Sequence, residues 1–333
     1  MIGRTNGYFG RLLGAALFAA FCLTANAYGA EPDQKFALSF WQDQRLYDKV
    51  TMTPVTEHGL IAELYQPKGQ HRPAAILTLG ACTLHSPRDF AQGLANEGYV
   101  TLALFYCGPK NGTDTLAAVP LEYMKTAIDW LLDNPSLGIK RVGVAGASQG
   151  AQAALITAAT YPQVAAVLAV APSNLVTQAL GPAPDRIKSA PQTSSWSLGG
   201  APVPYLPHGA GFESEAYPEA SIAVERINGP VLLISGTDDK AWPSSMMADK
   251  VMARLKAHNF RFRYEQLRYP NAGHGLFAAH DPADTLFAEK FAKESPGAMG
   301  GTREGVVAAQ ADSWPKALAF LDQALGGYGS ARR

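Results

Sequence analysis

A serine between glycines has the sequence context that most directly predicts chemistry. Ser148 is the centre of GASQG, which follows the apolar run RVGVA and precedes an alanine-rich segment. In this order of strand, turn and helix, a G-x-S-x-G motif presents a nucleophilic hydroxyl. Such a serine has a strained backbone, and glycines two residues away on either side avoid a clash. The alternative is an ordinary turn, because a glycine-rich chain also contains such pentapeptides by chance.

A serine hydroxyl needs a base, and the base needs an acid that orients it. On this scaffold the order along the chain is serine, acid, histidine. Asp238 and Asp239 follow the apolar run VLLISG, and His274 lies between two glycines in a later loop. We predict a triad of Ser148, Asp239 and His274. Asp239 is preferred because it comes three residues after Gly236, whereas Asp238 is better placed to cap the turn or the next helix. The alternatives are an N-cap for either aspartate and a backbone-bonded loop histidine for His274.

Backbone N–H groups are expected to stabilise the oxyanion of the reaction. One comes from Gln149, the residue after the nucleophile, and a second from the loop after the apolar run AAILTL. In that loop either Ala81 or Cys82 is the donor. Cys82 has no helix start behind it, so we expect it to line the pocket rather than to act as a nucleophile. The sequence contains no H-E-x-x-H motif and no Cys/His cluster, so it predicts neither a metal site nor a cofactor.

The elements around these residues alternate between short apolar runs and helical segments. Near-continuous apolar strands separated by helices predict an α/β fold, with a mostly parallel central sheet covered on both faces. An antiparallel hairpin precedes this pattern, and we expect one domain over residues 49–333. The expected strands are 49–55, 59–67, 74–80, 100–106, 141–147, 164–172, 229–236 and 260–270, and the expected helices are 89–99, 121–135, 149–160, 244–258 and 312–325.

The alternation stops over residues 173–228, which are rich in proline, glycine and serine. Long segments without regular structure inside a compact domain are often functional. We therefore expect an insertion that forms a lid and an acyl pocket, with Trp196, Tyr205 and Phe212 contacting the substrate. The alternative is a surface excursion without a role in binding.

The N-terminus differs from the rest of the chain. Two arginines precede a short apolar run, Leu12 to Leu23, which is followed by the small-residue sequence ANA. This pattern predicts a secretory signal peptide over residues 1–27, with cleavage after Ala27 or alternatively after Ala30. The run is shorter than the roughly 20 residues of a membrane span, so an uncleaved anchor is the less favoured alternative. We expect a periplasmic or secreted protein without a stable membrane anchor after cleavage, in which residues 28–48 form a surface arm.

Export would bring two cysteines into an oxidising compartment, where a disulfide can persist. Cys82 and Cys107 each follow an expected strand, and those two strands are expected to be neighbours. A bridge between them is compatible with this arrangement. Spacing alone does not establish disulfide geometry, so two buried free thiols are the favoured interpretation.

The composition excludes some classes of protein. With 47% hydrophobic and 17% charged residues the chain can form a full core, unlike a disordered chain. Its 28 basic and 28 acidic side chains give a formal net charge of zero, without a basic cluster. We therefore expect no nucleic-acid partner. The predicted triad, rather than the composition, favours a small-molecule acyl ester or thioester as the substrate.

Several longer segments resemble one known family. They match the C-terminal catalytic domain shared by acyl-CoA thioesterases and bile-acid-CoA:amino-acid N-acyltransferases, in the α/β-hydrolase superfamily and close to dienelactone-hydrolase-like enzymes. The resemblance covers most of Ala74 to Leu325, and its implied Ser, Asp and His fall on Ser148, Asp239 and His274. The segments are LEYMKTAIDWLLDNP, GVAGASQGAQAALITAATYPQVAAVLAVAPS, GTDDKAWPS, LRYPNAGH and AAQADSWPKALAFL.

The chain departs from the family in three ways. About 45 residues between Ala27 and Ala74 are too few for the family's N-terminal β-sandwich domain. The oxyanion loop LGACTLH has few glycines, and the signal peptide directs the chain away from acyl-CoA. We expect the fold and triad to carry over, but not the acyl-CoA substrate.

The predicted function is an exported serine hydrolase of esters or thioesters. The alternatives are an acyltransferase with an amine or alcohol acceptor and a non-catalytic binding protein. The resemblance implies that family members that transfer to amino acids use a cysteine nucleophile, so Ser148 favours hydrolysis.

Overall fold

The structure is a computed structural model, and the two predicted N-terminal segments, 1–27 and 28–48, lie outside the residues that it describes. Within the described part of the chain, no helix has both the length and the apolar character needed to cross a membrane. The described residues are 49–82, 85–108, 110, 113–182, 185–212, 216–276 and 299–326.

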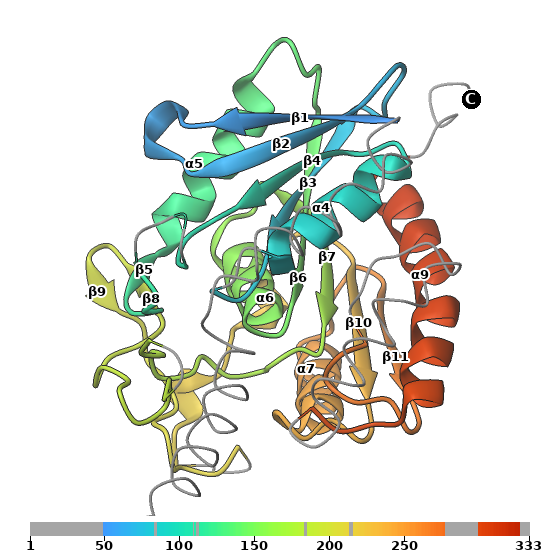
Figure 1. Cartoon of the computed structure of the whole chain (residues 1–333). Helices are drawn as coiled ribbons and strands as arrows, with labels where there is room; N and C mark the ends of the chain where they lie inside the picture. The colour runs from blue at the N-terminus through green and yellow to red at the C-terminus, as the bar shows by residue number, and fades with distance from the viewer. Residues whose placement is uncertain are drawn as a thin grey trace, which may run out of the picture.

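A large sheet organises the described residues (Figure 1). Its eight strands have the order β1-β2-β4-β3-β6-β7-β10-β11. The hairpin strands β1 and β2 pair antiparallel, β2 pairs antiparallel with β4, and the other neighbours are parallel. The strands are β1 Val50–Val55, β2 Ala62–Pro67, β3 Ala74–Leu79, β4 Val100–Leu104, β6 Arg141–Ala147, β7 Val164–Val170, β10 Val231–Gly236 and β11 Tyr264–Tyr269. The predicted α/β class and hairpin are confirmed.

Helices cover both faces of this sheet because its central strands are apolar on both sides. In β3, Leu77 packs into one core with side chains of α5, α6 and α7, whereas Ile76 packs into a second core with side chains of α4 and α9. Every residue of β3 and β10 is buried. The helices are α4 His85–Asn96, α5 Leu121–Asp133, α6 Gln149–Thr160, α7 Ser244–Ala257 and α9 Arg303–Leu325.

The predicted bounds differ from the observed ones by four residues or more at the start of three elements, and by three residues or fewer elsewhere. Helix α4 begins at residue 85 rather than 89, and β11 begins at residue 264 rather than 260. Helix α9 begins at residue 303 rather than 312, because the Thr302 side chain caps it by accepting a hydrogen bond from the Gly305 N–H. The early turns of α9 bury only residues of modest size, such as Val306 and Ala309, and so give a weak periodic signal.

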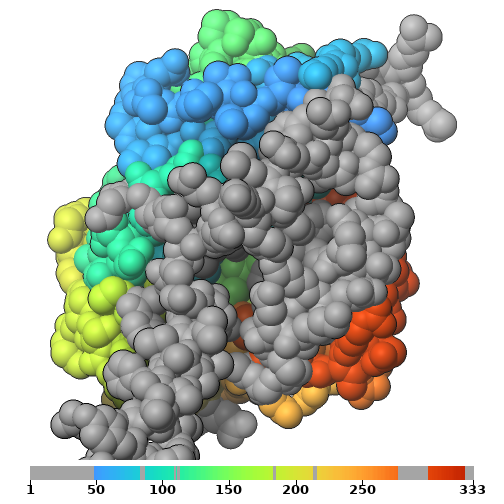
Figure 2. Space-filling model, in the orientation of Figure 1, coloured from blue at the N-terminus to red at the C-terminus, as the bar shows by residue number. Residues whose placement is uncertain are grey.

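The insertion over 173–228 contains regular structure that its composition does not suggest. Strands β8 (Trp196–Leu198) and β9 (Ala201–Pro202) pair with each other, and β8 pairs with β5 (Val119–Pro120). Two 3₁₀ helices follow, η3 (Pro218–Ala220) and η4 (Val224–Arg226). Figure 2 shows the yellow-green surface of the insertion at the lower left, away from the red C-terminal helix.

A buried glutamine attaches the insertion to helix α6. The amide of Gln152 donates to the Leu175 carbonyl at 2.9 Å and accepts from the Trp196 indole at 2.8 Å. Gln152 is fully buried, and a buried amide left without partners would cost stability. The insertion is therefore held against the helix that begins beside Ser148.

Candidate active site

Ser148 lies on a sharp turn between β6 and α6. Its φ of 57° and ψ of −124° are unusual for a residue with a side chain. A Cβ on Gly146 would lie 2.1 Å from the Gly150 carbonyl oxygen, and a Cβ on Gly150 would lie 2.1 Å from the Leu79 carbonyl oxygen. Both glycines are needed to form the turn, as the sequence motif suggested.

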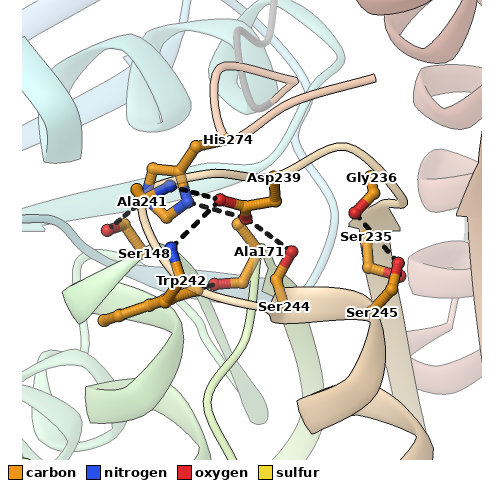
Figure 3. A network of polar contacts seen from close by, with 10 residues as sticks. All are labelled: Ser148, Ala171, Ser235, Gly236, Asp239, Ala241, Trp242, Ser244, Ser245 and His274. Carbon is orange, nitrogen blue, oxygen red and sulfur yellow. Dashed lines mark hydrogen bonds and ion pairs between the residues drawn. The ribbon is translucent and has the colours of Figure 1, made fainter. Parts of the chain in front are cut away.

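The Ser148 side chain does not cap the helix that it precedes but points to His274 (Figure 3). His274 Nε2 lies 2.7 Å from Ser148 Oγ, and its Nδ1 lies 2.8 Å from Asp239 Oδ2. The His274 and Asp239 side chains are only 4% and 1% exposed. The structure thus brings the three predicted residues together from the ends of β6, β10 and β11. In this geometry an imidazole can take the hydroxyl proton while a carboxylate holds the ring.

Asp239 is held by the start of the segment that leads into α7. Its Oδ1 accepts from the N–H groups of Ala241 at 3.0 Å and Trp242 at 3.2 Å. Its Oδ2 accepts from the Ser244 hydroxyl at 2.5 Å, in addition to His274. Hydrogen bonds to an ionised carboxylate are strong and fix its orientation. The Ser244 contact was not predicted, although a hydroxyl at a helix start is a common partner for a nearby loop.

Trp242 is a second site residue that the sequence analysis did not identify. Its indole N–H donates to the Ala171 carbonyl at 3.1 Å, and its ring meets the His274 ring edge-on at 5.3 Å (Figure 3). The side chain is buried, so it supports the imidazole from a fixed position. The only sequence signal was its place three residues after Asp239, in the GTDDKAW loop.

Asp238 has a different set of partners. Its Oδ2 accepts from the Gly301 N–H at 2.8 Å, and the Lys240 ammonium lies 4.0 Å from its Oδ1. The Asp238 side chain is 46% exposed. Of the two neighbouring aspartates, it is therefore Asp239 whose carboxylate meets His274.

The predicted oxyanion residues gather beside the turn. A Cβ on Gly150 would also lie 2.8 Å from the Gly80 Cα, so the start of α6 touches the loop after β3. Gln149 is the first residue of α6, and Ala81 and Cys82 follow Gly80 in that loop. Which of these two residues donates the second N–H stays a prediction.

Cys82 and Cys107 form a disulfide, with a Cα–Cα distance of 4.9 Å. The favoured expectation of two free thiols was wrong. Strands β3 and β4 pair in parallel, as predicted, so the residues just beyond their carboxyl ends come within bonding reach. The neighbouring Tyr106 hydroxyl donates to the Gly80 carbonyl. Burial raises the pKa of Tyr106, which keeps this hydroxyl a donor.

The three aromatic residues predicted to contact substrate have different environments. Trp196 is fully buried, meets the Tyr106 ring edge-on and bonds to Gln152, so it is a core residue and the prediction of a pocket wall was wrong. Its side chain points inward because β8 pairs with β5 over the main core. Tyr205 is half-buried against that core, and Phe212 is half-buried against Leu206 and its neighbours. Contact of Tyr205 and Phe212 with a substrate stays a prediction.

The fold is that of an α/β hydrolase, as two solved structures show. A Klebsiella pneumoniae protein assigned to the dienelactone hydrolases superposes with a TM-score of 0.52 at 17% identity, covering 82% of this chain and 98% of its own. An esterase from Pyrococcus furiosus gives a TM-score of 0.50 at 17% identity, covering 86% and 97%. At these identities the likeness establishes the fold.

Residues 119–327 match the family described as BAAT / Acyl-CoA thioester hydrolase C terminal, and the chain belongs to this family. A mouse peroxisomal succinyl-coenzyme A thioesterase is 26% identical over 322 residues, which cover 90% of this chain and 72% of the relative. A mouse acyl-coenzyme A amino acid N-acyltransferase 2 is 29% identical over 244 residues, covering 70% and 56%. The family thus includes both hydrolases and acyltransferases.

Proposed function

We propose that this protein is a serine hydrolase that cleaves carboxylic esters or thioesters through an acyl-enzyme. The observation that carries the proposal is the buried chain of hydrogen bonds from Ser148 through His274 to Asp239. Membership of a family with thioester hydrolases supports the reaction class.

In the proposed reaction, His274 Nε2 takes the proton of Ser148 as its Oγ attacks the acyl carbonyl carbon. The oxyanion that forms is stabilised by the Gln149 N–H and by a second N–H from Ala81 or Cys82. The protonated imidazole then donates its proton to the departing alcohol or thiol. Water then attacks the acyl carbonyl carbon while His274 takes its proton. The imidazole returns that proton to Ser148 Oγ as the bond to the acyl group breaks and the carboxylic acid leaves, and Asp239 keeps the imidazole oriented throughout.

A fluorophosphonate probe tests the nucleophile directly, because it forms a covalent bond with an activated serine. We expect labelling of the wild-type protein and of Ser136→Ala, an exposed serine outside the site. Ser148→Ala should not be labelled. Absence of labelling in the wild type would contradict the catalytic proposal and favour a binding protein.

An acyltransferase is the second candidate, because an amine or alcohol can replace water at the same acyl-enzyme. The similarity to an amino acid N-acyltransferase is the observation that favours it. A series of p-nitrophenyl esters and acyl thioesters, each with and without glycine, taurine or a simple alcohol, separates the two activities. Free acid as the dominant product in the presence of acceptors supports hydrolysis. Acylated acceptor as the dominant product would overturn it.

We also propose that the protein acts outside the cytoplasm after removal of residues 1–27. The Cys82–Cys107 disulfide supports this location, because such bonds persist in oxidising compartments. Cell fractionation with N-terminal sequencing of the mature protein tests the proposal. A cytoplasmic protein that retains its first residues would contradict it.

A further inference from the structure

A short segment at residues 299–301 contacts both loops that carry the acid and the base. The carbonyl of Met299 accepts from the His274 N–H at 2.8 Å and from the Lys240 N–H at 3.4 Å. One backbone oxygen therefore binds the base residue itself and the residue that follows Asp239.

The same segment makes two further contacts with the acid loop. Asp239 and Gly300 form an antiparallel bridge, and the Gly301 N–H donates to Asp238 Oδ2 at 2.8 Å. The Asp238 side chain thus fastens the far end of the segment, opposite the bond at Met299. Asp238 does this without a bond to His274, which is held by Asp239.

The contact between the segment and the two loops is close enough to exclude any side chain. A Cβ on Gly273 would lie 2.0 Å from the Gly300 carbonyl oxygen. A Cβ on Gly300 would lie 1.8 Å from the Asp238 carbonyl oxygen, and one on Gly301 would lie 2.2 Å from the Gly273 nitrogen. Backbone packed this closely leaves little freedom for one loop to move relative to the other.

The segment is also fixed at its other end. The Thr302 N–H donates to the Asn271 carbonyl at 2.8 Å, and the Thr302 side chain caps helix α9. Helix α9 packs on β6, β7, β10 and β11. The 299–301 segment therefore lies between a packed helix and the two site loops.

We propose that the 299–301 segment sets the distance between Asp239 and His274, and that Asp238 is a positioning residue that acts through it. The inference rests on the proposed function, because it assumes that this pair works in catalysis. Loss of the Asp238 carboxylate frees the Gly301 N–H and loosens the segment. The acid–base pair is then less well aligned in the transition state, while substrate binding is unchanged.

The test compares Asp238→Ala, Asp238→Asn and Asp249→Ala with the wild type, using ester hydrolysis and the fluorophosphonate labelling rate. Asp249 is a matched control, because it is a half-exposed aspartate paired with Arg268 outside the site. We expect Asp238→Ala to lower kcat about 10-fold with KM changed less than about twofold, as misalignment does. Asp238→Asn keeps an oxygen acceptor for Gly301 and should recover kcat to within about threefold of the wild type. Asp249→Ala should match the wild type.

A purely structural role would not give this pattern of a kcat loss rescued by asparagine. Three outcomes would each overturn the inference: wild-type kcat in Asp238→Ala, an equal loss of kcat in Asp238→Asn, or a change confined to KM. None of them would contradict the proposed serine hydrolase, provided that the wild type is labelled. Failure of the wild type to label would overturn the proposed function, and this inference with it.

If Asp238→Ala does not fold, Asp238→Glu provides the same test. It keeps the charge but moves the carboxylate outward by one methylene, and wild-type kcat in that variant would contradict the proposal.

Discussion

At the scale of single residues, the hydrogen bonds of Asp239 organise the candidate site. Its carboxylate accepts hydrogen bonds from the backbone of Ala241 and Trp242, the Ser244 hydroxyl and the His274 ring. These donors fix the orientation of the carboxylate, and its contact with His274 Nδ1 in turn sets the tautomer of the imidazole. An asparagine amide has the same shape without the charge, so it would keep the packing but would no longer set the tautomer of the imidazole.

Asp239→Asn therefore tests charge separately from shape. We expect kcat for an activated ester to fall about 10⁴-fold, because the amide favours the wrong imidazole tautomer. The folded structure should persist, as measured by circular dichroism. Ser244→Ala removes one of the four donors and leaves the charge, so it should lower kcat by less than about 10-fold. Equal losses in the two variants would contradict this account.

At the scale of elements, the site depends on loops that are joined across the carboxyl edge of the sheet. The disulfide joins the loop after β3, which carries the candidate oxyanion donors, to the end of β4. The 299–301 segment joins the loops after β10 and β11. Each junction restrains groups that the proposed reaction requires to be aligned.

Removal of the disulfide should affect stability and catalysis together. The two cysteines are 25 residues apart, and closing a loop of that length stabilises a fold by about 3.5 kcal/mol in the chain-entropy model. We expect the double variant Cys82→Ser with Cys107→Ser to lose about 2–4 kcal/mol of unfolding free energy. Its kcat should fall by a larger factor than its KM rises, because the loop after β3, which carries the candidate oxyanion donors, is no longer tied to the segment after β4. Chemical denaturation and ester kinetics provide the measurements, and unchanged stability would show that the bond contributes no restraint.

Two glycines with almost the same φ provide a test of how tightly the 299–301 segment is packed. Gly301 has φ of +78° and no room for a Cβ, whereas Gly200 has φ of +80° and open space around it. Gly200→Ala should cost about 1 kcal/mol for its backbone conformation alone. Gly301→Ala should cost about 2–4 kcal/mol, because overpacking adds to that strain. Equal shifts of the thermal midpoint would show that the segment is not tightly packed.

The elements that the sequence predicted best are those with a local signal. Helix α6 has the predicted bounds, because it follows a motif with a fixed turn. The burial of Trp196 was missed, because it depends on the buried amide of Gln152, a contact between residues 44 apart. The three candidate catalytic residues were found from residue type and chain order. The 299–301 segment was not found, since it acts through backbone atoms that have no characteristic residue type.

At the scale of the whole molecule, a buried ion cluster connects the antiparallel hairpin to the rest of the sheet. Glu63 of β2 pairs with Arg88 of α4 at 2.6 Å and with Lys110 after β4, and its side chain is 2% exposed. Both cations lie over the Phe105 ring. Burial alone would raise the pKa of Glu63, but its hydrogen bonds and the charges of Arg88 and Lys110 outweigh this effect and hold the pKa below its ordinary value of 4.5.

This cluster predicts how stability depends on acid pH. Because the folded pKa of Glu63 lies below its unfolded value, the stabilisation is present above pH 4.5 and is lost as the pH falls through the folded pKa. Glu63→Gln should lower the unfolding free energy at pH 7 by about 2–4 kcal/mol, because it breaks a largely buried ion pair. The difference from the wild type should shrink as the pH falls below 4.5. Glu265→Gln, which breaks an exposed pair with Arg263, should cost less than about 1 kcal/mol. A Glu63→Gln difference that does not depend on pH would contradict the assignment.

The 299–301 segment follows both site loops in the chain, and this order matters for biosynthesis. Ser148 and His274 are 126 residues apart, and Met299 is synthesised after both. A ribosome-bound chain can therefore contain Ser148, Asp239 and His274 before the residues that hold the two site loops together have been translated. Helix α9, which anchors those residues, must follow as well. The arrangement of the two site loops is consequently expected to be complete only after the 299–301 segment and helix α9 have left the ribosome.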